Sequence, residues 1–70
     1  MKLHRVESEM LRKVGYDPDS ETLWVIFNSG ETYHYLNVPP SEYKRLMEAE
    51  SHGQYMHQHI IGKYDYERIA

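Results

Sequence analysis

Residues 22–36 constrain the fold most, because they predict a β-hairpin whose two faces are both apolar or aromatic. The strands read Leu-Trp-Val-Ile-Phe and Glu-Thr-Tyr-His-Tyr-Leu, and Asn-Ser-Gly lies between them. A strand with one solvated face should alternate apolar with polar residues, and these strands do not. Either the rest of the chain covers both faces, or one face is left for a partner.

The length of the hairpin loop decides which side chains share a face. A two-residue loop, Ser29-Gly30, would place Trp24 and Ile26 beside Tyr33 and Tyr35. A three-residue loop over residues 28–30 would instead pair position 25 with 33. We favour this second loop, because Asn-Ser-Gly supplies a type I turn and then the glycine that such a bulge requires.

With the three-residue loop, the tyrosines share a face with the aliphatic core residues. That face carries Leu23, Val25, Phe27, Tyr33 and Tyr35. The opposite face carries Trp24, Ile26, Thr32, His34 and Leu36, a set that is too apolar for an ordinary solvated surface. Either the first ten residues or the C-terminal tail fold over it, or it is a binding face.

The remaining pattern predicts an α+β domain: a three-stranded antiparallel meander followed by one α-helix and a second short helix, packed on one sheet face. Strands are expected over 11–16, 22–28 and 31–37, and helices over 41–51 and 54–61, with Ser51 as a cap and Gly62 as the stop. In the first helix Tyr43, Leu46, Met47 and Glu50 form one side, and Glu42, Lys44, Arg45 and Glu48 form a wet face. Residues 1–70 are expected to form a single domain, with 1–10 a weakly ordered lead-in and 63–70 a C-terminal tail.

Composition narrows the functional classes. The chain has no cysteine, which excludes disulfides and thiolate metal sites, and its net charge of −3 argues against binding nucleic acid mainly by neutralising phosphates. The N-terminus lacks the pattern of a signal peptide and no segment approaches membrane-spanning length, so we expect a cytoplasmic protein with no membrane partner.

A specific succession of residues resembles a known family. The matches are Val14-Gly15-Tyr16-Asp17, Leu23, Val25, Phe27, Ser29-Gly30, Tyr33, Tyr35, Asn37-Val38-Pro39, Leu46, Ala49, Ser51, Gly53, Tyr55, Ile60 and Tyr64. Together they resemble the KTSC domain family, a short domain known as a stand-alone bacterial or phage protein and as the C-terminal piece of some lysyl-tRNA synthetases. The resemblance runs from about residue 8 to 66, and its central Tyr-x-Tyr motif maps onto Tyr33 and Tyr35. The chain departs from the usual pattern at Trp24 and Ile26.

The resemblance implies an uncharacterised binding module for which RNA, either tRNA or single-stranded RNA, has been proposed as the ligand. Such binding needs aromatic rings for bases and cations for phosphates. Stacking candidates are Tyr33, Tyr35 and Trp24, and phosphate candidates are Arg12, Lys13, Lys44, Arg45 and Lys63. The alternatives for these residues are core packing of the tyrosines and a solvated helix face for Lys44 and Arg45.

A second hypothesis belongs to a different functional class: a protein-interaction or homodimerisation module that uses Trp24, Ile26 and His34. Catalysis is not expected, because the chain has no cysteine nucleophile, no motif-embedded serine and no glycine-rich phosphate loop. No metal or other cofactor is expected either. His57 and His59 would point to opposite sides of a helix, and His52 would lie two turns from His59.

Overall fold

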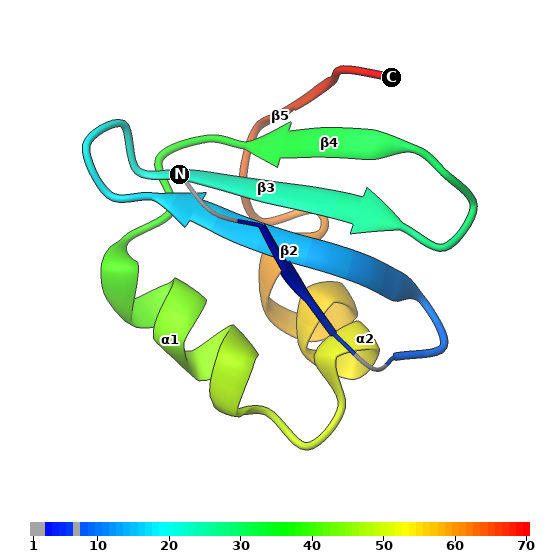
Figure 1. Ribbon diagram of the computed structural model, residues 1–70. Coiled ribbons are helices and arrows are strands. Elements are labelled where there is room, and N and C mark those ends of the chain that lie inside the picture. Colours follow the sequence, from blue (N-terminus) through cyan, green and yellow to red (C-terminus); the bar gives the residue numbers. More distant parts are fainter. Residues whose placement is uncertain (1–2, 7) are drawn as a thin grey trace.

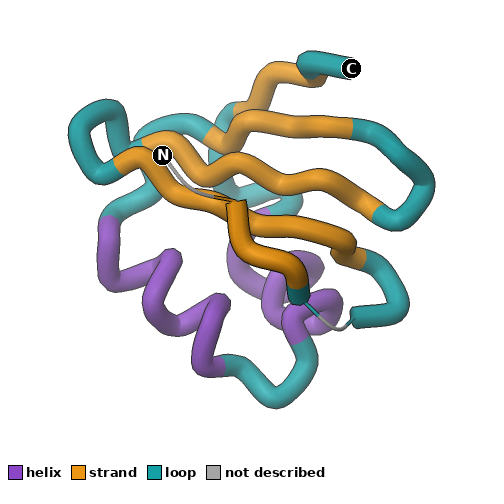
Figure 2. Tube along the Cα trace, in the orientation of Figure 1, coloured by secondary structure: helices purple, strands orange, loops and turns teal. Residues whose placement is uncertain are grey.

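Five antiparallel strands form one sheet, and the helices lie against one of its faces (Figures 1 and 2). This computed structural model describes residues 3–6 and 8–70 of the chain. The strands follow one another across the sheet in chain order: β1 (Leu3–Arg5), β2 (Leu11–Asp17), β3 (Thr22–Phe27), β4 (Thr32–Tyr35) and β5 (Tyr66–Arg68). Between β4 and β5 the chain forms α1 (Pro40–Glu48), α2 (His52–Tyr55) and a π-helical turn, η1 (Met56–Ile60).

The β3–β4 hairpin has the three-residue loop. Val25 pairs with Tyr33 and Leu23 with Tyr35, as the longer loop predicts. The Gly30 N–H donates to the Phe27 carbonyl and the Phe27 N–H donates to the Glu31 carbonyl, both at 2.9 Å. Gly30 has φ +98°, the left-handed region that glycine enters without steric cost. The predicted register is therefore confirmed, and the tyrosines face the helices.

Residues on this inner face build the core with the helices. The buried apolar residues are Leu11, Val14, Leu23, Val25, Tyr35, Val38, Leu46, Met56 and Ile60. Tyr43 and Met47 of α1 pack against this cluster, so the predicted apolar stripe of the first helix is confirmed. The second helix starts two residues before the predicted 54–61, at His52, and from Met56 it is π-helical. Its predicted ends are confirmed: the Ser51 hydroxyl accepts the Gln54 N–H at 3.2 Å, and Gly62, with φ +81°, follows η1.

The sheet has two more strands than the predicted meander, one at each edge. Leu3–Arg5 pairs with β2, within the segment expected as a lead-in, and Tyr66–Arg68 pairs with β4, within the expected tail. Both strands have three exposed residues, so neither shows the alternation on which a strand prediction rests. They form by taking up the backbone hydrogen bonds that the edges of β2 and β4 would otherwise leave to water. Residues 1, 2 and 7, also within the expected lead-in, lie outside the described residues.

Glu42 joins three segments of the chain and does not lie on a wet face as predicted. The hydroxyls of Tyr55 and Tyr64 donate to its two carboxylate oxygens, the second at 3.1 Å. Glu42 lies one turn before the buried Leu46, so it borders the packed side of α1. Burial, and then the bond to Glu42, raise the pKa of Tyr55 to about 12. Within residues 3–6 and 8–70 no helix has the length and apolar character that crossing a membrane needs.

The loop geometry predicts the effect of Gly30→Ala. A Cβ at Gly30 would meet nothing within 4 Å, so the cost comes from the positive φ alone. We expect Gly30→Ala to lower the free energy of unfolding by about 1–2 kcal/mol in urea denaturation. Gly53→Ala is the matched control: it lies in α2, its Cβ would make an ordinary 3.4 Å contact with Met10, and alanine favours a helix. A Gly30→Ala chain as stable as wild type would contradict the register argument.

The bonds to Glu42 predict a second effect on stability. A glutamine at this position would keep the shape but lose the charge that both hydroxyls face, so we expect Glu42→Gln to lower the free energy of unfolding by about 1–2 kcal/mol. Glu48→Gln, at an exposed position of the same helix, should change it by less than about 0.5 kcal/mol. Equal unfolding midpoints for the two variants would show that Glu42 does not hold the helices and the tail together.

Candidate functional site on the two faces of the sheet

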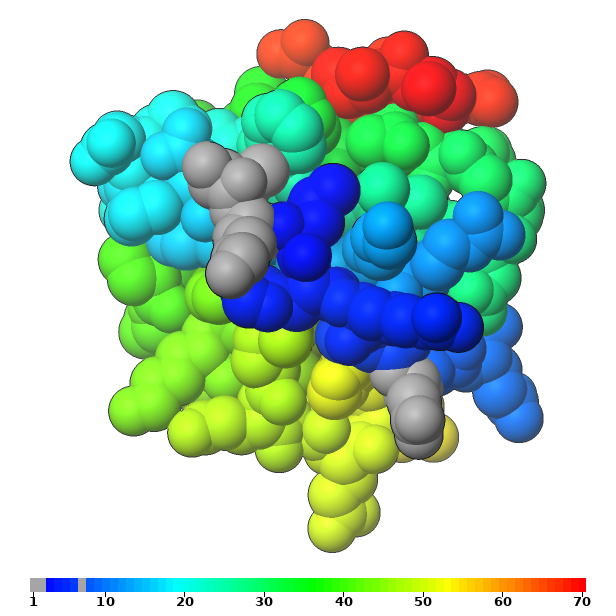
Figure 3. Space-filling model, in the orientation of Figure 1, coloured from blue at the N-terminus to red at the C-terminus, as the bar shows by residue number. Residues whose placement is uncertain are grey.

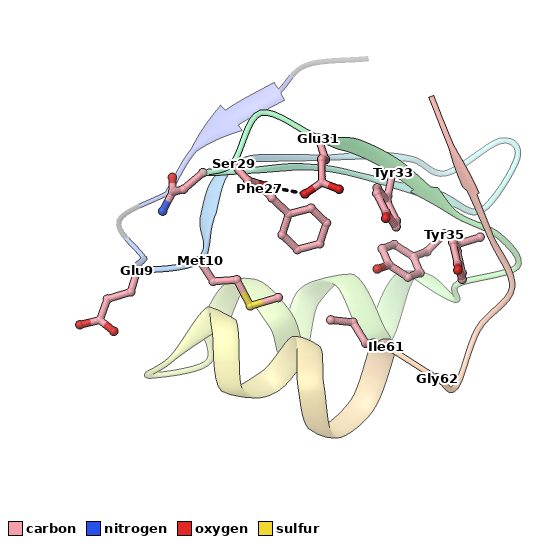
Figure 4. A pocket seen from close by; sticks show the side chains of 11 residues that line it. Glu9, Met10, Phe27, Ser29, Glu31, Tyr33, Tyr35, Ile61 and Gly62 are labelled. Atoms are coloured by element: carbon pink, nitrogen blue, oxygen red, sulfur yellow. Dashed lines mark hydrogen bonds between the residues drawn. The ribbon is translucent and has the colours of Figure 1, made fainter. Parts of the chain in front are cut away.

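The inner face of the sheet continues past the helices into a groove lined by aromatic side chains. Phe27, Tyr33 and Tyr35 lie on its sheet side, and Met10 and Ile61 lie across from them (Figure 4). The ring of Tyr66 lies beside those of Tyr33 and Tyr35. The groove has a volume of about 620 Å³ and is open to solvent on one side. Its polar residues lie at one end, around the hairpin loop.

The two central tyrosines belong to this groove and not to an open sheet face. Tyr35 is 3% exposed, and burial raises its pKa to about 12. Tyr33 is half-buried: its ring stacks on Tyr66 at 5.3 Å and meets the edge of Phe27 at 5.4 Å. The burial of Tyr35 removes it from the surfaces that a nucleic-acid base could reach in this structure.

Carboxylates border the groove. Glu9 and Glu31 are both among its lining residues, whereas no lysine, arginine or histidine within residues 3–6 and 8–70 is. Glu31 accepts a hydrogen bond from the Ser29 hydroxyl at 2.7 Å and lies 3.7 Å from the guanidinium of Arg68. The groove is therefore apolar inside and acidic at its rim.

In the described part of the chain, no helix lies on the outer face of the sheet, which holds a second aromatic pair. The Trp24 indole stacks on the His34 imidazole, with centroids 4.0 Å apart. Both rings and Ile26 are half-buried. The Nε2 atom of His34 is buried and has no hydrogen-bond partner among the described residues, so stacking holds this ring in place.

The edge strands extend the outer face and do not cover it with a second layer. Leu3, Gly15, Trp24, His34 and Glu67 occupy one row of paired positions across the sheet. In the space-filling view the N-terminal strand crosses the front of the molecule and the C-terminal segment lies along the opposite edge (Figure 3). The sequence left two possibilities for this face: a terminal segment folds over it, or it is a binding face. Among the described residues, no segment covers the outer aromatic pair.

Basic side chains gather at the β1 edge of the same face. Arg5 pairs directly with Lys13, which pairs with Ile26, so all three point outward. Arg12 lies at the register shift in β2, and its guanidinium donates to the Asn28 carbonyl at 3.0 Å. The three cations are exposed and, with Ser8 and Asn28, line a shallow hollow of about 590 Å³. Sequence reasoning missed Arg5 because its strand was not predicted.

The other predicted cations lie elsewhere. Lys44 and Arg45 are exposed on α1, which packs on the inner face, so the sheet separates them from Trp24 and Lys13. Lys63 is exposed directly after Gly62, beside the inner groove. The predicted RNA-contacting residues are thus divided between two faces. Among the described residues, no group of three or more histidines, aspartates or glutamates is arranged to hold a metal ion.

Comparison with known proteins identifies the family to which this chain belongs. Residues 7–64 match the model of the KTSC domain. The chain belongs to the KTSC domain family. A KTSC domain protein of known crystal structure from Yersinia pestis superimposes with a TM-score of 0.93 and 34% identity, over 99% of this chain and 97% of that one.

Two kinds of KTSC relative are similar in sequence. An uncharacterised protein from Stutzerimonas stutzeri is 43% identical over 83% of this chain and 82% of its own length. A lysine–tRNA ligase from Nostoc is 35% identical over 97% of this chain, which spans only 12% of that ligase. A similar sequence therefore occurs in a protein of about this size and as a segment of a much larger one.

The burial of Tyr35 predicts a loss of stability at high pH. The unfolded chain releases this proton near pH 10, whereas folded Tyr35, with its raised pKa, holds it until about pH 12. The contribution of neutral, buried Tyr35 to the free energy of unfolding is complete below about pH 10 and is lost as the pH rises toward 12. We expect the free energy of unfolding, measured by urea denaturation, to fall less between about pH 9 and about pH 11 for Tyr35→Phe than for wild type. Tyr66→Phe, at an exposed position, should keep most of the wild-type drop, because Tyr66 contributes less than burial does to the raised pKa of Tyr35. The same drop in both variants would contradict the burial of Tyr35.

Proposed function

We propose that this KTSC domain is a non-catalytic RNA-binding module that uses the outer face of the sheet. The contact surface is the β1 edge together with the outer aromatic pair: Arg5, Arg12 and Lys13 for phosphates, and Trp24 and His34 for a base. Tyr33 and Tyr35 are not part of this surface, because they lie on the inner face.

The observation that supports the proposal most strongly is the direct pairing of Arg5 with Lys13. Like charges at directly opposite positions of neighbouring strands destabilise a sheet. The ion pair recorded among the described residues, Arg68 with Glu31, lies at the β5 side and does not neutralise them. Among the described residues no ion pair to Arg5 or Lys13 is recorded, and arginine and lysine are side chains that commonly contact phosphates.

The outer aromatic pair supplies the second requirement. Trp24 lies two residues from Ile26, the partner of Lys13, so the indole and the cations share one side of the sheet. Single-stranded RNA is held by stacking of splayed bases beside contacts to phosphates. The net charge of −3 means that the cations act as a local patch, so binding should be weak and sensitive to salt. The lysine–tRNA ligases that carry a similar segment make tRNA the first ligand to test.

The proposal predicts that binding depends on the outer cations and not on those of α1. Fluorescence anisotropy with a labelled tRNA and a labelled oligouridylate, measured over a series of low salt concentrations, gives both the affinity and its salt slope. We expect Arg12→Gln and Lys13→Gln to weaken binding and each to reduce the slope by about one. Lys44→Gln and Arg45→Gln are matched controls on the other side of the sheet and should change neither quantity. Bound RNA should also quench Trp24 fluorescence.

Two results would contradict the proposal: no complex at high micromolar protein in low salt, or equal losses from the outer and the α1 variants. The second candidate function, a protein-interaction or homodimerisation surface, uses the same Trp24, Ile26 and His34. It is favoured instead if light scattering shows a dimer that Trp24→Ser dissociates while RNA fails to bind.

A further inference from the structure

The inner groove is not used by the proposed function, yet it has the features of a binding site. It is concave and mostly apolar, with a few polar groups at one end. The rings of Tyr33, Tyr35 and Tyr66 lie within 6.2 Å of one another, so three phenol groups converge on its sheet side. Figure 4 shows Phe27, Met10 and Ile61 bordering the same space. A groove of this kind accommodates an apolar group with a polar end.

The charges around the groove define the polar end of its ligand. Glu9 and Glu31 are lining residues, and none of the lysines, arginines and histidines that the structure describes is. The two cations nearby are Lys63, exposed after Gly62, and Arg68, whose exposed guanidinium lies 3.7 Å from Glu31. Aromatic faces attract cations through the ring quadrupole, and a carboxylate strengthens a hydrogen bond from an ammonium or a guanidinium. Charge complementarity therefore favours a positively charged ligand and disfavours a phosphate. This distinguishes the groove from the basic outer edge.

β5 is an extended segment of the chain itself that contacts the sheet side of the groove. Tyr66 stacks on Tyr33 at 5.3 Å, and Arg68, two residues later, places its guanidinium 3.7 Å from Glu31. An aromatic residue and an arginine in alternation thus contact the sheet side of the groove from one extended segment. The Arg68 side chain is 60% exposed, so this ion pair is weak and a competing cation can replace it.

We propose that the inner groove binds an extended peptide of a protein partner, with a lysine or arginine directed to Glu31 and an apolar side chain against Phe27 and Ile61. β5 keeps its place beside β4, and the partner lies in the groove between the sheet and Ile61, with its apolar side chain beside Tyr33. Arg5 and Lys13 of the proposed RNA surface point to the other face of the sheet. The basic hollow and this groove share Asn28 but no charged residue, so substitutions of their charged residues test the two sites separately.

The test is a nuclear magnetic resonance titration of the isotope-labelled full chain with acetyl-Tyr-Gly-Arg-Ile-amide. The comparison peptide has glutamate in place of arginine. We expect the arginine peptide to shift the amide signals of Glu31, Tyr33 and Ile61, and the glutamate peptide to leave them unchanged. Glu31→Gln should weaken the affinity about threefold to fivefold, as loss of an exposed charge pair does. Glu48→Gln on α1 is the matched control and should bind as wild type does.

The outcomes separate this proposal from the proposed RNA function. Lys13→Gln should leave peptide binding unchanged, and Glu31→Gln should not weaken RNA binding. The proposal is overturned if millimolar arginine peptide shifts no groove signal, if the glutamate peptide binds equally well, or if the shifts map to Trp24 and His34. Any of these can occur while RNA binding at the outer face remains intact.

Discussion

The loop between β3 and β4 sets the register on which the rest of this structure depends. Gly30 takes a positive φ, so the loop closes over three residues and Val25 faces the same side as Tyr33. A loop shorter by one residue would move the side chains of one strand relative to the other. The buried set that packs on Leu46, Met56 and Ile60 would then no longer form from Leu23, Val25 and Tyr35. One backbone conformation therefore assigns every hairpin side chain to the core or to the surface.

Coverage of only one sheet face then gives the domain two unlike surfaces. The helices pack on the inner face and leave a groove whose rim is acidic, whereas the outer face has an aromatic pair beside exposed cations. The net charge of −3 does not reveal that acidic and basic side chains lie in different places, because it adds local patches of opposite sign. A small domain with one core can in this way present two surfaces that favour ligands of opposite charge.

The elements with a local signal were predictable from the sequence, and those that depend on distant partners were not. The hairpin, both helices, the Ser51 cap and the Gly62 stop all follow from short-range patterns. β1 and β5 lack alternation and exist because neighbouring edges offer hydrogen bonds. The same reason explains which residues of the outer surface the sequence could identify. Trp24 and His34 were identified from the hairpin, but the pairing of Arg5 with Lys13 depends on β1, which was not predicted. Glu42 looked solvated because the tyrosines that bind it come from other segments.

The most direct test of the central claim is a measurement of the hairpin register in solution. Phe27 and Glu31 are a hydrogen-bonded pair, so Trp24 and His34, three pairs further along, are a non-hydrogen-bonded pair, in which the Cα atoms approach most closely. A nuclear Overhauser effect between their Hα protons, together with one between the Hα protons of Ile26 and Thr32, is the result that this account predicts. A strong effect between the Hα protons of Val25 and His34 would instead show the two-residue loop, and would contradict the assignment of both faces.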